Sequence, residues 1–323
     1  MPVIEGVHIA PNWTSSAGAL EGILEFRGAS LPRHAIMGLT GHAWHTCLGS
    51  RGGVVALPSG PLDLDWQAMT ANYARTGVVW ERFQPTGAID ADRALAIAWA
   101  TDRLDAGQPV IGFDFHLHEF SIVYGYDRPG EHFLVDNVLS EEVGPIAHWR
   151  DWPSAVGKIE LLAPAGPLEI EPVQAVSDAL RTALSCFAGR DGPADGQARG
   201  TAALDAWADA LDGDTVVDRA GNAYTLAVLQ AARLDGAAFL RDLVESLPDL
   251  AGPLAQAERA LREESQALAP LLTLFPFPSG GHGNVANTGL RRAAAMALRR
   301  AGEHERSASG ALAEAFARLA GAD

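Results

Sequence analysis

The sequence predicts an α+β protein, in which a mixed domain of antiparallel strands and helices at residues 1–165 precedes an all-helical domain at residues 166–323. Two observations carry this prediction. In the first half, apolar residues at helical spacing are interspersed with short aromatic or β-branched segments, some of which alternate with period two. After the segment 163–167, which is rich in proline, alanine and glycine, the composition changes to Ala, Leu, Arg and Glu at helical spacing.

The first helix is expected at residues 15–27, because apolar side chains recur there at helical spacing and Gly28 suits a left-handed end. Thr14 or Ser15 can cap this helix through a hydroxyl, or the helix start can favour negative charge on a nucleophile or oxyanion. The elements expected next are a short helix ending at Gly38, a glycine-containing loop into an aromatic strand near Trp44, strands at 54–57 and 78–83, helices at 65–75 and at 90–106 (capped by Asp90), strands over 110–137 with a turn at 127–130, and a strand at 158–162.

The strand expected at residues 116–127 carries most of the polar residues of interest. Period-two alternation places His116, His118 and Tyr124 on one face of this strand and Glu119 on the other. His118 and Glu119 therefore cannot both point into one cleft unless the strand is bulged.

Helices dominate the second half of the chain. They are expected at 172–188, 200–211, 222–246, 250–274 and 289–319. Gly236 and Gly302 leave open whether two of these helices are continuous. The segment 275–284, rich in proline and glycine, either covers a pocket or forms a tight connection between two helices.

The bulk properties exclude several classes of protein. A formal net charge of −16 argues against nucleic acid or an anionic membrane as a partner. We expect no signal peptide, because the first residues lack a basic segment followed by an apolar run, and no apolar run approaches the roughly eighteen residues of a membrane-spanning helix. Cys47 and Cys186 lie far apart and need not pair, which fits a reducing compartment. We therefore expect a cytoplasmic protein.

Several short motifs resemble one protein superfamily. The segment 38–44, Gly-Leu-Thr-Gly-His-Ala-Trp, is similar to a glycine-rich stretch of butirosin-biosynthesis-protein-H-like domains, and the segment 203–211 is similar to a motif of the helical domain fused to them. The first half resembles the papain-like superfamily, specifically its C39-like and butirosin-H-like branches. In that family a catalytic Cys begins a helix that runs about thirteen residues to a Gly. Counting back thirteen residues from Gly28 reaches Ser15.

The resemblance also implies positions for the other catalytic residues. The family's His lies six residues before the Gly of a Gly-Tyr-Asp strand end. Counting back six residues from Gly125 reaches Glu119, and His118 lies immediately before it. The family's Asp or Asn lies on the following strand, where Asp136 fits. The resemblance thus implies a papain-like fold with a site of Ser15, His118, Glu119 and Asp136.

The main departure from the family is serine at the cysteine position. This change removes the thiolate, so that Ser15 needs a general base within hydrogen-bond reach, and classical peptidase activity is not expected. Glu119 can act as that base if burial raises its pKa, or a bulge can bring His118 there instead.

The resemblance implies a pseudo-peptidase of secondary-metabolite biosynthesis that performs acyl transfer from a carrier-protein-bound thioester, or cyclisation. It would act on a small-molecule substrate without a cofactor or metal. The residues expected to contact that substrate are Trp13, Thr14, Ser16, His42, Trp44, His116 and Tyr124. The acidic surface would repel an acidic carrier protein, unless a patch at Arg291, Arg292, Arg299 and Arg300 overrides it; alternatively, these arginines form a solvated helix face.

Two other functions stay open. The first is a non-catalytic papain-like module that binds a ligand or a partner. The second is a metal-dependent enzyme that uses His42, His45, His116 and His118. The oligomeric state also stays open, a homodimer included.

Overall fold

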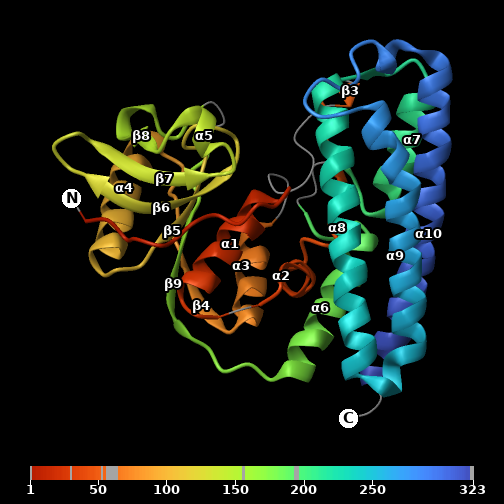
Figure 1. The fold of residues 1–323 in the computed structure, drawn as a ribbon, viewed down its shortest axis with the longest axis horizontal. Coiled ribbons are helices and arrows are strands. Elements are labelled where there is room, and N and C mark those ends of the chain that lie inside the picture. The colour runs from red at the N-terminus through yellow and green to blue at the C-terminus, as the bar shows by residue number, and fades with distance from the viewer. Residues whose placement is uncertain are drawn as a thin grey trace. The chain divides into compact units, whose positions relative to one another are not determined.

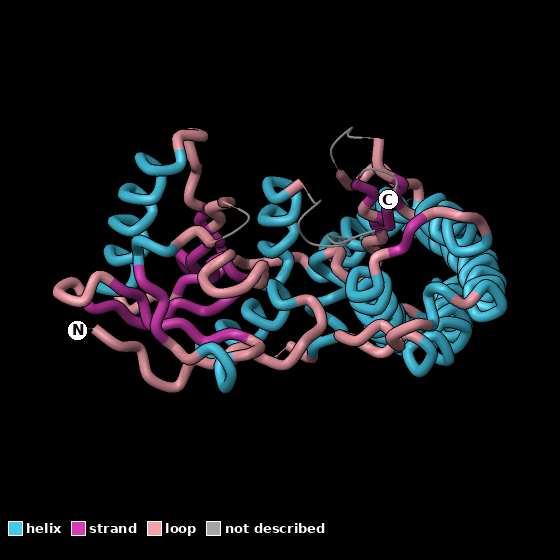
Figure 2. The backbone as a smooth tube through the Cα atoms, turned by 90° about the horizontal axis from the view of Figure 1, so that it is seen from above, coloured by secondary structure: helices cyan, strands magenta, loops and turns pink. Residues whose placement is uncertain are grey.

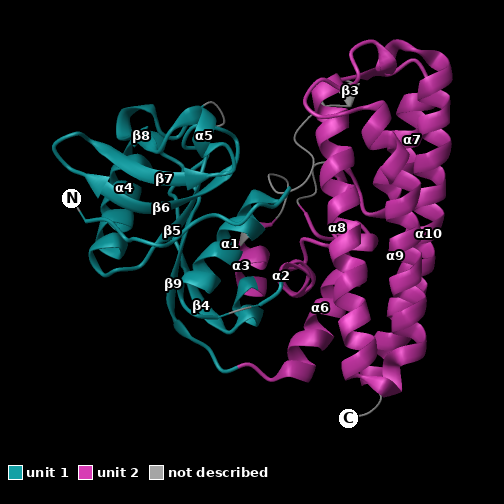
Figure 3. Ribbon diagram, in the orientation of Figure 1, with its two compact units in different colours: residues 1–32, 73–169 teal, residues 33–72, 170–323 magenta. Residues whose placement is uncertain are grey.

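The computed structural model has mixed α+β architecture, and it divides into two compact units (Figure 3). Unit 1 comprises residues 1–32 and 73–169, and unit 2 comprises residues 33–72 and 170–323. The border at residue 169 lies near the expected change of composition, whereas residues 33–72 group with the helical unit. The structure describes residues 2–29, 31–51, 54–55, 65–154, 157–192 and 196–320.

Among the described residues, an antiparallel sheet of six strands forms the centre of unit 1 (Figures 1 and 2). Its strands are, in spatial order, β4 (Val78–Arg82), β9 (Leu161–Pro167), β5 (Val110–Phe113), β6 (Phe120–Asp127), β7 (His132–Asn137) and β8 (Ile146–His148). The expected turn between β6 and β7 is confirmed, and the Gly130 N–H donates to the Asp127 carboxylate there, at 3.0 Å.

Helices cover both faces of this sheet. Val123 packs in the apolar core beneath α4 (Ile89–Asp105), whereas a side chain at Gly22 of α1 (Ser15–Phe26) would lie 3.2 Å from Ile122. Because neighbouring side chains of a strand point to opposite faces, α4 and α1 lie on opposite sides of β6. Burial on both faces accounts for the uninterrupted apolar sequence of β5.

Two glycines of α1 allow the chain before it to cross the helix closely. A Cβ at Gly18 would lie 2.3 Å from the carbonyl oxygen of Ala10, and one at Gly22 would lie 1.8 Å from that of His8. The Ala10 N–H donates to the Gly18 carbonyl at 3.1 Å. Segment 8–10 is therefore held directly against the helix that begins at Ser15.

Strand β6 begins at Phe120, so the strand expected from residue 116 is wrong in its first part. Residues 115–119 form a bend instead. Asp114 has a φ of 66°, which turns the chain out of β5. Its buried carboxylate holds this conformation by accepting hydrogen bonds from Ser154 and from the Gly157 N–H. The alternation argument consequently does not apply to His118 and Glu119.

Strand β9 also differs from its expectation at residues 158–162, because it starts at Leu161 and extends to Pro167. Strand β5 pairs with β9 only at Leu161 and Leu162. Beyond these residues β9 pairs, among the described strands, with β4 alone. Pro164 has no backbone N–H to donate, but no residue of β5 pairs with it, so proline is tolerated at this position of the strand.

The helix α2 (Arg33–Thr40) runs past its expected end at Gly38. Gly38 instead makes room for Phe239, whose ring would lie 2.3 Å from a Cβ at this position. The left-handed residue that follows α2 is Gly41, with a φ of 100°.

The N-terminus of α4 is not capped by Asp90 as expected. The N-cap residue is Ala88, whose side chain forms no capping hydrogen bond. Asp92, one turn inside, accepts hydrogen bonds from the N–H groups of Thr86 and Gly87, both at 2.8 Å. Asp92 thus binds N–H groups of the chain that precedes the helix. The spacing of apolar residues in the sequence does not reveal this interaction.

Long helices make up most of unit 2 (Figure 1). They are α6 (Pro172–Phe187), α7 (Thr201–Asp212), α8 (Arg219–Ser246), α9 (Ala251–Leu274) and α10 (Thr288–Ala320). Helix α9 packs against α8 and α10, and α10 also contacts α6 and α7. Helices α8 and α10 continue through Gly236 and Gly302 without a break. The segment 275–284 connects α9 and α10, and its Phe275 is fully buried in the helical core.

Several short α-helices and strands also occur among the described residues. They are α3 (Trp66–Tyr73), α5 (Ser140–Val143), β1 (Cys47–Leu48), β2 (Ser50–Arg51), β3 (Val54–Val55), β10 (Ala198–Arg199) and β11 (Val216–Val217). The strand expected at 54–57 overlaps β3, and residues 56–57 lie outside the described residues. Cys47 and Cys186 are buried and unpaired with each other. In the described ranges, no helix has the length and apolar character needed to cross a membrane.

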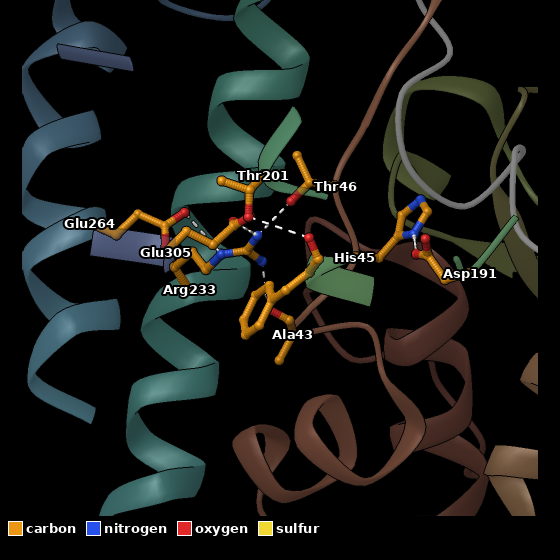
Figure 4. A network of polar contacts seen from close by, with 9 residues as sticks. Ala43, His45, Thr46, Asp191, Thr201, Arg233, Glu264 and Glu305 are labelled. Carbon is orange, nitrogen blue, oxygen red and sulfur yellow. Dashed lines mark hydrogen bonds and ion pairs between the residues drawn. The ribbon is translucent and has the colours of Figure 1, made fainter. Parts of the chain in front are cut away.

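A buried arginine joins the helices of unit 2 (Figure 4). Arg233 on α8 donates to Glu264 on α9 at 2.9 Å and to Glu305 on α10. It also donates to the Ala43 carbonyl at 2.7 Å and to the Thr46 hydroxyl. All three charged side chains are 0% exposed. This network attaches the segment after α2 to three long helices.

Replacement of Arg233 tests the network. Arg233→Met leaves Glu264 and Glu305 buried without their arginine partner, so we expect the free energy of unfolding to fall by about 3–5 kcal/mol. The matched control Arg262→Met removes the half-exposed pair with Glu258, which is worth at most about 1 kcal/mol. Urea unfolding followed by circular dichroism measures both variants, and equal effects would contradict the assigned role of Arg233.

A second substitution tests the close crossing over α1. Gly22→Ala should lower the free energy of unfolding by about 1–3 kcal/mol, because its methyl group would collide with the His8 carbonyl. Gly310→Ala, in an exposed part of α10 with open space around it, should instead stabilise by about 0.5–1 kcal/mol. Thermal and urea unfolding compare the two variants, and a stabilising Gly22→Ala would refute the crossing.

Candidate active site

Ser15 is the first residue of α1, and its hydroxyl is not a helix cap. The N-cap position belongs to Thr14, whose side chain forms no capping hydrogen bond. Helix capping therefore does not explain the hydroxyl of Thr14 or that of Ser15. Ser15 is only 2% exposed, so its hydroxyl must find its partners within the protein.

Those partners are Glu119 and the backbone of Phe120. Ser15 Oγ donates a hydrogen bond to Glu119 Oε2 at 2.5 Å and accepts one from the Phe120 N–H at 3.0 Å. Glu119 is half-buried, whereas His118 is exposed. The structure thus brings Glu119, and not His118, to Ser15.

The bend before β6 positions both of these partners. The Asp114 N–H donates to the Glu119 carbonyl at 3.2 Å, which closes the bend. Phe120 is buried and opposes Phe113 in the sheet, with ring centroids 5.0 Å apart. The packing of the Phe120 ring therefore fixes the position of the Phe120 N–H, which binds Ser15 Oγ. It also fixes the position of the preceding residue, Glu119.

The surroundings of Ser15 Oγ favour negative charge there. The positive end of the α1 dipole and the Phe120 N–H both stabilise an anion at this atom. Glu119 Oε2 is placed to take the hydroxyl proton. Next along the helix, Ser16 is fully buried and hydrogen-bonds to Tyr73, whose pKa is raised by burial. Ser16 is therefore part of the packing beside the site.

Asp136 on β7 binds other groups. Its Oδ2 accepts a hydrogen bond from the Ile9 N–H at 3.0 Å and lies 3.5 Å from His8 Nδ1. Its Oδ1 accepts one from the Ser140 hydroxyl at 2.8 Å. In the described part of the chain, Asp136 thus anchors the segment that crosses α1, and no hydrogen bond joins it to Glu119.

The remaining site residues expected in unit 1 differ in exposure. Trp13, beside the site in sequence, is 43% exposed, and Thr14 is buried. Tyr124 is half-buried, and burial together with the charge of Asp136 raises its pKa. His116 lies in the bend, where burial and nearby His148 lower its pKa. Trp13 therefore offers the accessible aromatic surface of this group.

The other two expected residues belong to unit 2. Trp44 is fully buried, its ring lies 6.0 Å from that of Phe239, and its Nε1 donates to the Gly38 carbonyl at 3.0 Å. Trp44 is therefore a packing residue. Burial, and secondarily the charge of His45, lower the pKa of His42 to about 3, so His42 stays neutral.

Sequence reasoning missed two contributors to the site. One is the backbone N–H of Phe120, and the other is Asp114, which shapes the bend.

No cluster of three or more His, Cys, Asp or Glu residues able to hold a metal ion occurs in the described ranges. No protein-family profile and no curated protein matches the sequence. The roles of the site residues therefore follow from their contacts.

A double-mutant cycle tests the Ser15–Glu119 contact. Ser15→Ala leaves the Phe120 N–H and Glu119 without this partner and should lower the free energy of unfolding by about 1–3 kcal/mol. In combination with Glu119→Gln, we expect a coupling energy of about 0.5–3 kcal/mol from urea unfolding. Ser121→Ala, at a buried serine of β6, serves as control and should show no coupling to Glu119→Gln. Additive effects of the Ser15 and Glu119 changes would contradict the contact.

Proposed function

We propose that this protein is a non-peptidase enzyme on a papain-like fold, and that it transfers acyl groups through Ser15 in small-molecule, secondary-metabolite biosynthesis. The hydrogen bond from Ser15 Oγ to Glu119 carries this proposal, because it pairs a hydroxyl nucleophile with a proton acceptor at 2.5 Å.

Two further features support the papain-like assignment. The helix that begins with the nucleophile packs on one face of an antiparallel sheet, as α1 does on β6. The proton acceptor precedes the strand whose end carries Gly125, Tyr126 and Asp127, the motif on which the family resemblance rests. Glu119 then occupies the position of the family's histidine.

The proposed reaction proceeds in two balanced steps. Ser15 Oγ attacks the carbonyl carbon of a thioester, the carbon–sulfur bond breaks, and the hydroxyl proton passes through Glu119 to the departing thiol. An amine or hydroxyl of the small-molecule acceptor then attacks the acyl-serine. The carbon–oxygen bond to Ser15 breaks, and Glu119 transfers the acceptor's proton back to Oγ. If the acceptor belongs to the acyl group itself, the same steps perform a cyclisation.

The arginine patch considered for carrier docking is engaged within unit 2. Arg291 donates to the carbonyl groups of Ala210, Leu211, Gly213 and Thr215. Arg299 pairs with Asp209 and Asp212. Because these contacts use much of the patch's positive charge, a free acyl-pantetheine thioester is the first donor to test.

One observation favours a second candidate, a non-catalytic papain-like module that binds a ligand or partner. Ser15 is 2% exposed, and its hydroxyl already has both a donor and an acceptor partner. In this second candidate, the hydrogen bond between Ser15 and Glu119 has a structural role alone and attaches α1 to the bend before β6.

Intact-mass spectrometry distinguishes the two candidates. After incubation with acetyl-pantetheine, we expect a serine-bound acetyl adduct that survives denaturation, is absent in Ser15→Ala and is retained in the control Ser121→Ala. Glu119→Gln should slow adduct formation by about 10²–10⁴-fold, the range for loss of a general base. The absence of any adduct across a panel of acyl-pantetheines would rule out covalent catalysis and favour the binding module.

A further inference from the structure

Strand β8 forms one edge of the sheet of unit 1, because β7 is its sole partner among the described strands (Figure 1). Hydrogen bonds to β7 or the residue before it bracket β8 at both ends. The Val135 N–H donates to the Pro145 carbonyl at 2.8 Å, and the Trp149 N–H donates to the Glu131 carbonyl at 2.9 Å. Pro145 and Trp149, which flank β8, thus turn their backbone groups toward β7.

The backbone groups of Ile146 and His148 point the other way. In an antiparallel pair, only every second residue turns its N–H and carbonyl groups toward the partner strand. Ile146 follows Pro145, and His148 precedes Trp149, so both lie at the alternate positions, and both are exposed. Their two N–H groups and two carbonyl groups are therefore directed at the open edge, where an added strand can pair with them.

Exposed apolar side chains accompany this edge. Ala147 is buried in the apolar core beneath α4, so the side chains of Ile146 and His148 point to the opposite face of the sheet. Ile146 is 46% exposed. The segment before β8, whose helix α5 packs against β7, exposes three more large apolar side chains. They are Val138 (37%), Leu139 (41%) and Val143 (38%). Apolar residues gathered in this way on a surface indicate an interaction site.

Carboxylates lie near both ends of β8. Glu141 and Glu142 belong to α5, on the N-terminal side of β8, and Glu131 directly precedes the residue that pairs with the last residue of β8. All three are exposed, and no ion pair joins them to a cation among the described residues. Arg150 lies 3.6 Å from Asp151 and is thus already paired. The surroundings of the edge are therefore negatively charged.

We infer that the edge of β8 binds an extended, basic segment of a partner protein as an additional strand. The segment exchanges backbone hydrogen bonds with Ile146 and His148, and its alternate side chains contact the exposed apolar residues. Its basic residues lie near the glutamates at the two ends. A second copy of this chain fits less well, because each copy has a net charge of −16 and would bring its own glutamates to the interface. The interaction does not depend on the Ser15 chemistry.

A synthetic peptide tests this interaction with the full chain. The probe is Arg-Arg-Val-Thr-Val-Arg-Arg with blocked ends, titrated into protein labelled with nitrogen-15. It should shift the amide resonances of Ile146 and His148 with a Kd on the order of 0.1–1 mM, because a short peptide loses conformational freedom on binding. A peptide with Glu in place of Arg should bind at least tenfold more weakly, and so should one whose three central amides are N-methylated. Ser15→Ala should bind the probe like the wild type.

A substitution on β8 tests the role of its outward N–H. His148 has a φ of −69°, which proline also adopts, so His148→Pro removes this N–H without disturbing the pairing with β7. It should weaken binding of the probe at least tenfold. The matched control His148→Ala removes the imidazole and keeps the N–H, so its Kd should stay within about threefold of the wild type, because the added strand pairs through backbone groups.

Several results would overturn the inference. They are the absence of shifts at Ile146 and His148, equal binding of the acidic peptide, and unchanged binding of the N-methylated peptide, which needs no variant to fold. Unchanged binding by a folded His148→Pro has the same meaning. Sedimentation equilibrium measures self-association, and a dimer that His148→Pro dissociates would assign the edge to a second copy and overturn the inference as well.

Discussion

The hydroxyl of Ser15 is the contact on which unit 1 depends, because it joins the start of α1 to the start of β6. This contact requires that α1 lie flat against the sheet and that the chain turn sharply after β5. Gly18 and Gly22 satisfy the first requirement, since they let segment 8–10 cross the helix closely. Asp114, in its left-handed conformation, satisfies the second. Glu119 meets Ser15 as a consequence of both.

A buried or half-buried carboxylate hydrogen-bonds to a polar side chain in both units. In unit 1 the Glu119 carboxylate orients the Ser15 proton. In unit 2 the Asp191 carboxylate hydrogen-bonds to His45 Nδ1. The two pairs differ in what surrounds them, because Ser15 Oγ also has a backbone donor, whereas His45 Nε2 is buried without a hydrogen-bond partner among the described residues.

Local sequence patterns predicted the elements whose formation depends on local spacing, including α1, β7 and the long helices of unit 2. They failed where distant residues decide the backbone. The bend at residues 115–119 depends on Asp114 binding Ser154 and Gly157. Counting along the family motif selected Ser15 and Glu119 as candidates, and the structure places them in contact. The Phe120 N–H left no signal, because every residue type except proline carries this group.

The buried charges around Arg233 make the stability of unit 2 depend on pH. Burial, and also the charge of Glu305, raise the pKa of Glu264 well above its usual value, although Arg233 opposes them. The folded protein therefore holds a proton that the unfolded chain releases above the ordinary pKa of a glutamate, so folding takes up a proton. The stability contributed by this group is complete in acid and declines by about 1.4 kcal/mol per pH unit up to the raised pKa. The buried Glu264, and not its arginine partner, thus makes unit 2 lose stability as the pH rises.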